Sequence, residues 1–207
     1  MGNNILQAKV TIEGTRPLFW HKFGPDAIPL EKKEKTGVAG NDPEEWRKTA
    51  MVTEEGQLYL EPTYVFATIR EGSKYVKKGR GSIVTSMIAT LQVVDTRILV
   101  DRFMPGYPNG KAYDVAKEKA PSQDPFAPVY LDIRMVKNPQ TKAANIRYRI
   151  VASPGWTCSF TIEWDRTIVS RGEMESSLID AGKLVGIGNG RKIGMGRFEV
   201  TLFEVIE

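Results

Sequence analysis

The sequence predicts an α+β fold, with a ferredoxin-like or RNA-recognition-motif-like antiparallel sheet, two helices and long loop insertions. Two observations predict it. Segments in which apolar and polar residues alternate, typical of strands with one buried face, are interspersed with segments of helical spacing. In chain order they read strand, helix in two pieces, strands, helix, strand, which is the β-α-β-β-α-β order of that fold. The 207 residues contain no internal repeat, so we expect one domain over residues 1–207 with insertions near 24–57 and 103–128.

The first strand is expected over residues 5–13, where apolar side chains occupy every second position. The insertion that follows is rich in lysine and glutamate between residues 31 and 45, so we expect an exposed excursion there. Within it, Asn41 or Asp42 can cap a short helix that has Pro43 at its first position and continues through Trp46.

The first helix of the fold is expected in two pieces. The first piece covers residues 63–78, where apolar side chains recur with helical spacing, and a Gly-Arg-Gly sequence ends it. Ser82 can cap the second piece. The apolar residues of that piece are Ile83, Val84, Met87, Ile88 and Leu91.

Four more strands are expected before the second helix. One lies at 98–100 and another at 129–136, and a proline-rich loop separates them. The last two, 146–150 and 158–164, alternate clearly and are joined by a turn that contains Pro154 and Gly155, which predicts a hairpin between them.

A helix over residues 174–185 and a last strand from residue 198 enclose a glycine-rich loop at residues 186–197. So many glycines are explained by positive φ angles, or by close approach of a backbone or a phosphate to the main chain. The basic side chains among them suit a phosphate chain. The alternative is a tight crossover from helix to strand whose basic side chains are only solvated. The candidate binding residues of this loop are Gly188, Gly190, Arg191, Lys192, Gly194 and Arg197.

Two other basic segments are candidate nucleic-acid contacts. On the helix expected at 63–78, four basic residues would share one face, with a fifth just beyond, in a stripe able to follow phosphates. Two arginines would project from one face of the strand expected at 146–150. The alternative for both segments is a solvated surface. The candidates are Arg70, Lys74, Lys77, Lys78, Arg80, Arg147 and Arg149.

The glycine-rich loop resembles a motif of the RAMP superfamily, the RNA-binding subunits of CRISPR effector complexes, which include repeated backbone subunits. The similar piece runs from Leu184 to Phe198 and contains the pattern G-x-G-R-x-x-G-x-G-R, placed between the second helix and the last strand. This resemblance covers the topology and that short piece. It implies RNA binding by the loop and by basic residues of the first helix. The aspartate-bearing loop of the RAMP backbone nucleases has no convincing match here.

Most of the chain also resembles a group of uncharacterised phage and prophage proteins, and this resemblance implies no established activity. The similar pieces are Gly14-Thr15-Arg16-Pro17-Leu18, His21-Lys22-Phe23, Asp42-Pro43-Glu44-Glu45, Pro154-Gly155-Trp156 and the Val-Gly-Ile-Gly start of the glycine-rich loop.

The chain has one cysteine, Cys158, and one histidine, His21. This excludes an internal disulfide framework and a Cys/His zinc cluster, and it leaves His21 as the candidate general base for RNA cleavage. There is no second histidine and no paired spacing of carboxylates, so we expect no catalytic residue, no metal and no cofactor. Cys158 lies on the apolar face of a strand and is expected in the core.

The formal net charge of +4 permits an acidic partner without demanding one. We expect a non-catalytic nucleic-acid-binding protein that coats single-stranded RNA or DNA as a repeated subunit, and thus a homo-oligomer along the strand. The alternatives are a phage-encoded factor that binds another protein, such as a CRISPR inhibitor or an assembly protein, and an RNA endonuclease that uses His21. No secretory signal or membrane segment is evident, so we expect the cytoplasm of a bacterial host or phage-infected cell.

Overall fold

The computed structural model describes residues 4–22, 42–137 and 144–206, and the chain forms two compact units. Unit 1 comprises Met1–Leu18, Tyr59–Asp101 and Pro154–Glu207, and unit 2 comprises Phe19–Leu58 and Arg102–Ser153. Both expected insertions fall in unit 2. The expectation of a single domain over the whole chain stays a prediction.

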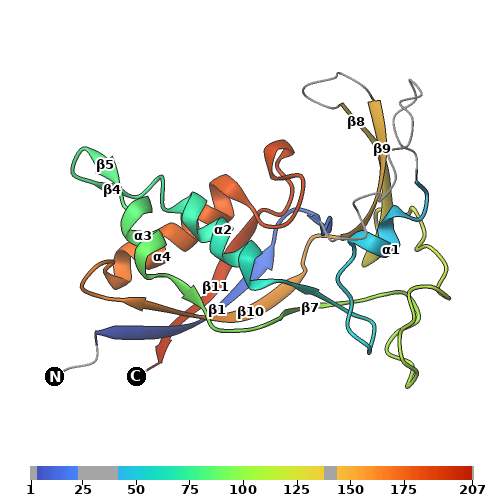
Figure 1. Cartoon of the computed structure of the whole chain (residues 1–207), viewed down its shortest axis with the longest axis horizontal. Coiled ribbons are helices and arrows are strands. Elements are labelled where there is room, and N and C mark those ends of the chain that lie inside the picture. Colours follow the sequence, from blue (N-terminus) through green and yellow to red (C-terminus); the bar gives the residue numbers. More distant parts are fainter. Residues whose placement is uncertain (1–3, 23–41, 138–143, 207) are drawn as a thin grey trace, which may run out of the picture. The chain divides into compact units, whose positions relative to one another are not determined.

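The main sheet has the strand order of a ferredoxin-like fold (Figure 1). The second strand of that fold is represented by two short segments, β6 and β7, so the order of the four fold positions is 4-1-3-2. The predicted fold class is therefore confirmed. The strands run in the order β11 (Phe198–Ile206), β1 (Ile5–Gly14), β10 (Thr157–Asp165), β7 (Ile98–Phe103) and β3 (Gln57–Leu60), and β6 (Gln92–Val93) also pairs with β10.

Three helices cover one face of this sheet (Figure 1). They are α2 (Pro62–Gly72), α3 (Val84–Thr90) and α4 (Arg171–Asp180), and α4 continues as a π-helix, Ala181–Val185. The alternation seen in the sequence of β1 buries every second side chain, and β10 does the same in antiparallel register, with Val10 opposite Phe160. The helices contribute Val65, Ile69, Met87, Met174 and Leu178 to the same core.

Helix α2 ends at Gly72 and does not continue to residue 78, so this prediction was wrong. A Cβ atom on Gly72 would lie 2.3 Å from the carbonyl oxygen of Ser177 and 2.7 Å from the Cβ of Ala181. Glycine is therefore the residue that lets α2 approach α4 so closely. The helical spacing of the sequence continues past this point, but the chain turns instead.

A small hairpin follows α2 in place of the expected last turns of helix. It consists of β4 (Lys77–Lys78) and β5 (Gly81–Ser82), joined by a turn in which Gly79 has a φ of 59°. Ser82 belongs to β5, and α3 begins after Ile83 with no side-chain cap. The expected cap at Ser82 was therefore wrong.

Unit 2 contains a second sheet, of strand order β2-β9-β8. Its strands are β2 (Leu18–Phe19), β8 (Val129–Lys137) and β9 (Ala144–Ala152). The hairpin is formed by β8 and β9, whereas β10 pairs with β1. The hairpin expected between residues 146–150 and 158–164 was therefore wrong. Alternation identified both segments as strands, but the apolar face of β10 belongs to the core of the main sheet.

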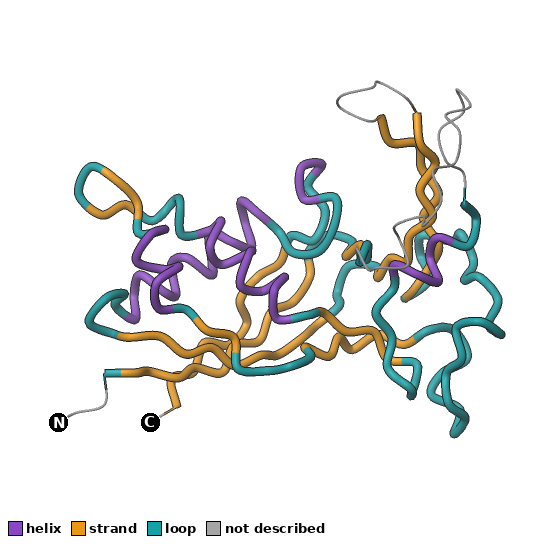
Figure 2. Tube along the Cα trace, in the orientation of Figure 1, coloured by secondary structure: helices purple, strands orange, loops and turns teal. Residues whose placement is uncertain are grey.

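Little other regular structure is present in the described part of unit 2. Helix α1 (Glu45–Thr49) starts after Glu44, later than expected, and the Asp42 carboxylate accepts the Glu44 N–H at 3.1 Å. Pro43 is thus outside the helix, and Asn41 lies outside the described residues. Residues 104–128 contain no helix or strand, as their prolines predicted (Figure 2).

Candidate nucleic-acid interface

The glycine-rich loop has a backbone that requires glycine. Gly186, Gly188, Gly190, Gly194 and Gly196 all have φ between 67° and 85°, which confirms the expectation of positive φ. A Cβ on Gly196 would lie 1.8 Å from the carbonyl oxygen of Ile187, and one on Gly186 would lie 2.5 Å from that of Met195. The two ends of the loop are therefore in close backbone contact.

The main chain of this loop is hydrogen-bonded largely within the protein. The N–H of Ile187 donates to Gly196 O at 2.8 Å, and the N–H of Gly196 donates to Pro17 O at 2.8 Å. The N–H groups of Gly194 and Met195 donate to carbonyls within the loop. These donors hold the crossover from helix to strand and are not available to a phosphate.

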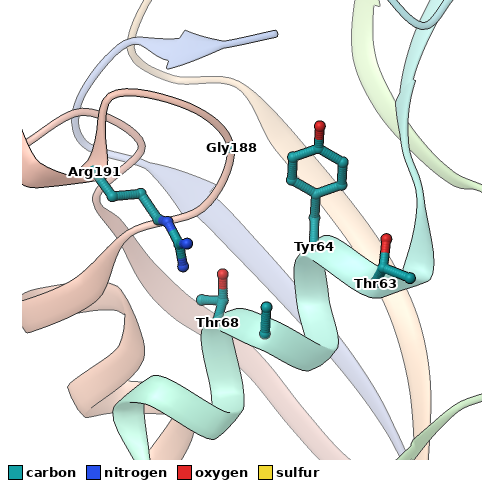
Figure 3. A pocket seen from close by; sticks show the side chains of 6 residues that line it. Thr63, Tyr64, Thr68, Gly188 and Arg191 are labelled. Carbon is teal, nitrogen blue, oxygen red and sulfur yellow. The ribbon is translucent and has the colours of Figure 1, made fainter. Parts of the chain in front are cut away.

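A groove lies between this loop and α2, and we call it the loop groove (Figure 3). It has a volume of about 210 Å³. The side chain of Arg191 reaches from the loop toward Thr68 of α2, and Tyr64 stands on the same side of the helix (Figure 3). The lining residues are Thr63, Tyr64, Ala67, Thr68, Gly188 and Arg191.

Arg191 is the cation of the loop groove. Its guanidinium group forms no hydrogen bond or ion pair with any residue in the described part of the chain, and neither does the exposed ammonium of Lys192. Thr68, opposite, donates its hydroxyl proton to Gly186 O at 3.2 Å. The groove therefore presents guanidinium donors on one wall and hydroxyl-bearing side chains on the other.

A second groove lies on the other side of α2, against β6, and we call it the β6 groove. Its volume is about 550 Å³. Two of its residues, Thr63 and Ala67, also line the loop groove. The complete lining is Pro62, Thr63, Phe66, Ala67, Arg70, Gln92 and Val93.

The basic stripe expected on the first helix does not exist as one face. Arg70 lies on α2, Lys74 follows its end, and the other three cations belong to the β4–β5 hairpin. The carboxylate of Glu71 binds both Arg70, at 3.2 Å, and Lys74, at 2.6 Å. The hydrogen bond from Lys74 lowers the pKa of Glu71 below its ordinary value.

The hairpin cations differ in their surroundings. The side chain of Lys78 pairs with Glu173 at 3.6 Å, whereas the side chains of Lys77 and Arg80 are exposed and form no hydrogen bond or ion pair with any residue that the structure describes. Arg197, at the end of the glycine-rich loop, has a structural role through its main-chain carbonyl, which accepts hydrogen bonds from the N–H groups of Thr15 and Arg16. The hairpin follows the C-terminal end of α2, while the loop groove borders its N-terminal half.

Arg147 and Arg149 lie in a charged cluster of unit 2, together with Glu45. The carboxylate of Glu45 accepts Arg147 Nη1 at 2.6 Å and the Tyr148 N–H at 2.8 Å. Arg149 is only 5% exposed and stacks near the Phe19 ring, and burial lowers its pKa. The sequence predicted either a binding surface or a solvated surface for Arg149. Because Arg149 is buried, it belongs to neither.

His21 belongs to the same cluster. Its Nδ1 lies 3.9 Å from Glu45 Oε1. The pKa of His21 is lowered mainly by burial. The positive charges of Arg147 and Arg149 lower it further, whereas the charge of Glu45 acts in the opposite direction. Glu45 was not foreseen as a neighbour of His21 because the two come together only through the fold. A catalytic role for His21 stays untested.

Metal-ligand groups and membrane-spanning helices were searched for in the described ranges 4–22, 42–137 and 144–206. Within them, no three His, Cys, Asp or Glu side chains are grouped as metal ligands would be, and no helix has the length and apolarity needed to cross a membrane. Cys158 is buried in the core as expected, and burial raises the pKa of its thiol.

The sequence did not single out the hydroxyl-bearing wall of the loop groove. Nothing in the sequence distinguishes Thr63, Tyr64 and Thr68 from other helix residues. They become candidate binding residues only because they lie opposite Arg191 in the groove. Their spacing on α2 could have indicated a shared face, but nothing in the sequence shows that the loop lies against that face.

No protein-family model matches this chain, and no curated protein sequence matches it. Solved structures that are similar to this chain include the following two. One is a cryo-EM structure of the Type III-B Cmr-beta bound to cognate target RNA, with a TM-score of 0.49, 12% identity, and coverage of 98% of this chain and 61% of that one. The other is the crystal structure of Cmr6 from Pyrococcus furiosus, with a TM-score of 0.48, 10% identity, and coverage of 98% and 100%.

The present chain spans only 61% of the length of the Cmr-beta chain. At these TM-scores and identities, neither similarity supports a conclusion about this chain beyond the values themselves. The resemblance to phage and prophage proteins stays a prediction.

Proposed function

We propose that this protein binds single-stranded nucleic acid in the loop groove without cleaving it, and that several copies lie side by side along one strand. One observation carries the proposal. Arg191 extends into a groove while its guanidinium forms no bond within the described part of the chain. An arginine without an internal partner, held at a groove, is suited to an anionic ligand.

The chemistry around Arg191 favours a phosphate chain as that anion. Residues 186–197 contain three basic side chains and no acidic one, so no carboxylate of the loop competes for the guanidinium. The guanidinium can donate two parallel hydrogen bonds to phosphate oxygens. Tyr64 on the opposite wall offers an aromatic face for a base, and stacking of this kind tolerates any sequence.

The test is a double variant, Arg191→Ala/Lys192→Ala, measured for affinity to a single strand over a range of salt concentrations. We expect weaker binding and a salt dependence reduced by about 0.7 for each phosphate that the variant no longer neutralises. The matched control is Lys9→Ala, which removes an exposed charge from β1. A folded double variant with the affinity and salt dependence of the wild type would refute the proposal.

The competing functions give different outcomes in the same preparation. A protein-binding factor would purify without nucleic acid, as judged from its absorbance at 260 and 280 nm, and would bind no strand. An endonuclease would shorten the strand, and His21→Ala would abolish the cleavage. Particles that lengthen with the strand in electron micrographs would support assembly of several copies.

A further inference from the structure

The loop groove and the β6 groove lie on either side of α2 and share two lining residues, which form a low ridge between them. Thr63 and Ala67 line both grooves and are one helical turn apart, so they share one face of α2. Both side chains are short. A strand whose phosphate is held by Arg191 in the loop groove can therefore cross α2 at these residues and enter the β6 groove.

The β6 groove has the surfaces that a nucleobase requires. Its volume of about 550 Å³ is in the range of small-molecule sites. Phe66 supplies an aromatic ring, and Pro62 and Val93 add apolar surface. The amide of Gln92 can both donate and accept at the polar edge of a base, and it forms no other side-chain hydrogen bond in the described part of the chain.

Arg70 adds a positive charge to the wall of the β6 groove. Its partner Glu71 also binds Lys74, so two cations share one carboxylate and one positive charge remains uncompensated. A nucleotide has an apolar face for Phe66, a polar edge for Gln92 and a phosphate for Arg70. An apolar protein side chain would use only the first of these three.

We propose that the β6 groove is a base-binding subsite, in which one base of the bound strand stacks on Phe66 while Arg191 and Arg70 hold phosphates on either side of the ridge. This subsite rests on the proposed function. It adds a prediction that the loop groove alone does not make, namely that part of the base-dependent affinity is lost when the Phe66 ring is removed.

The experiment compares strands that differ only in their bases. Oligo(U) and oligo(dT) of about 12 nucleotides are each measured beside an abasic strand with the same number of phosphates. For the wild type we expect the abasic strands to bind more weakly by about tenfold or more, because they lose stacking on both Phe66 and Tyr64. Phe66→Ala should lower the affinity for the strands with bases by about tenfold and leave the abasic strands unaffected, while Phe66→Tyr should bind both as the wild type does.

The outcomes separate this subsite from the proposed function. Arg191→Ala should weaken both kinds of strand equally, and a wild-type protein that binds neither kind would refute both proposals. If Phe66→Ala weakens both kinds equally or changes neither, the subsite is refuted while the loop groove can still stand. If the melting temperature shows that Phe66→Ala is unfolded, Phe66→Leu, which keeps apolar volume without the ring, must show the same selective loss.

Discussion

Gly194 and Gly196 of the glycine-rich loop are alike in backbone angle but not in surroundings. Both have positive φ, at 83° and 67°. A Cβ on Gly194 would meet no atom within 4 Å, whereas a Cβ on Gly196 would lie 1.8 Å from the carbonyl oxygen of Ile187. The first glycine therefore avoids only backbone strain, and the second also permits a backbone contact.

This difference predicts unequal effects of alanine at the two positions. Gly194→Ala should lower the free energy of unfolding by about 1 kcal/mol, from the strained φ alone. Gly196→Ala should lower it by about 3 kcal/mol or more, because Ile187 is main chain and cannot move aside cheaply. Urea unfolding of both variants checks this. Equal losses would mean that the loop ends are not in contact.

Arg191 and Arg149 show which property of a candidate residue the sequence could predict. Both were expected at a binding surface because of their charge and local pattern. Arg191 lines the loop groove, whereas Arg149 is only 5% exposed and lies near the Phe19 ring in unit 2. Exposure depends on what packs over a strand, and that partner is distant in the sequence.

Helix α4 shows how an element fixes the position of the loop that follows it. Its N-terminus has a capping box, in which the Ser170 hydroxyl accepts the Glu173 N–H at 3.3 Å and the Glu173 carboxylate accepts the Ser170 N–H at 2.7 Å. These bonds satisfy two N–H groups that would otherwise have no partner at the helix start.

Removing this cap should destabilise the protein without changing the loop groove. Ser170→Ala should lower the free energy of unfolding by about 1 kcal/mol. Affinity for a single strand should stay that of the wild type, because Ser170 does not line the loop groove. Chemical denaturation and a binding titration check the two parts. Lost affinity in the folded variant would show that α4 acts directly on binding.

The strands and helices themselves could be predicted more reliably than their partners. Period-two alternation located β1, β8, β9, β10 and β11 to within a few residues. It could not show that β9 pairs with β8, because either neighbour in the sequence offered a matching apolar face. The end of α2 depended on contact of Gly72 with Ser177 and Ala181, which helical spacing does not reveal.

At the scale of the whole molecule, His21 links stability to pH. Burial holds its folded-state pKa below the ordinary value of about 6.5, so the unfolded chain takes up a proton at higher pH than the folded protein. Stability should therefore fall as the pH drops from about 7 to 5. His21→Gln should flatten this part of the curve, measured by urea unfolding at each pH.

Two acidic residues with lowered pKa affect the stability of the protein at lower pH than His21 does. Glu71 and Glu173 are stabilised as carboxylates by hydrogen bonds to Lys74 and Ser170, respectively. Their contribution is present above the ordinary glutamate pKa of about 4.3 and is lost below it. His21→Gln should leave this acid limb unchanged. A curve that remains as steep between about pH 7 and 5 would show that other groups titrate there.

The contact of α2 with α4 at Gly72 has a consequence for the kinetics of binding. It fixes α2 against the helix that leads into the glycine-rich loop, and the Thr68 hydroxyl ties α2 to the loop at Gly186. Both walls of the loop groove are thus held in place before a ligand arrives, so little ordering is needed during encounter. The association rate should then follow diffusion and charge attraction, and substitutions in the groove should mainly shorten the lifetime of the complex.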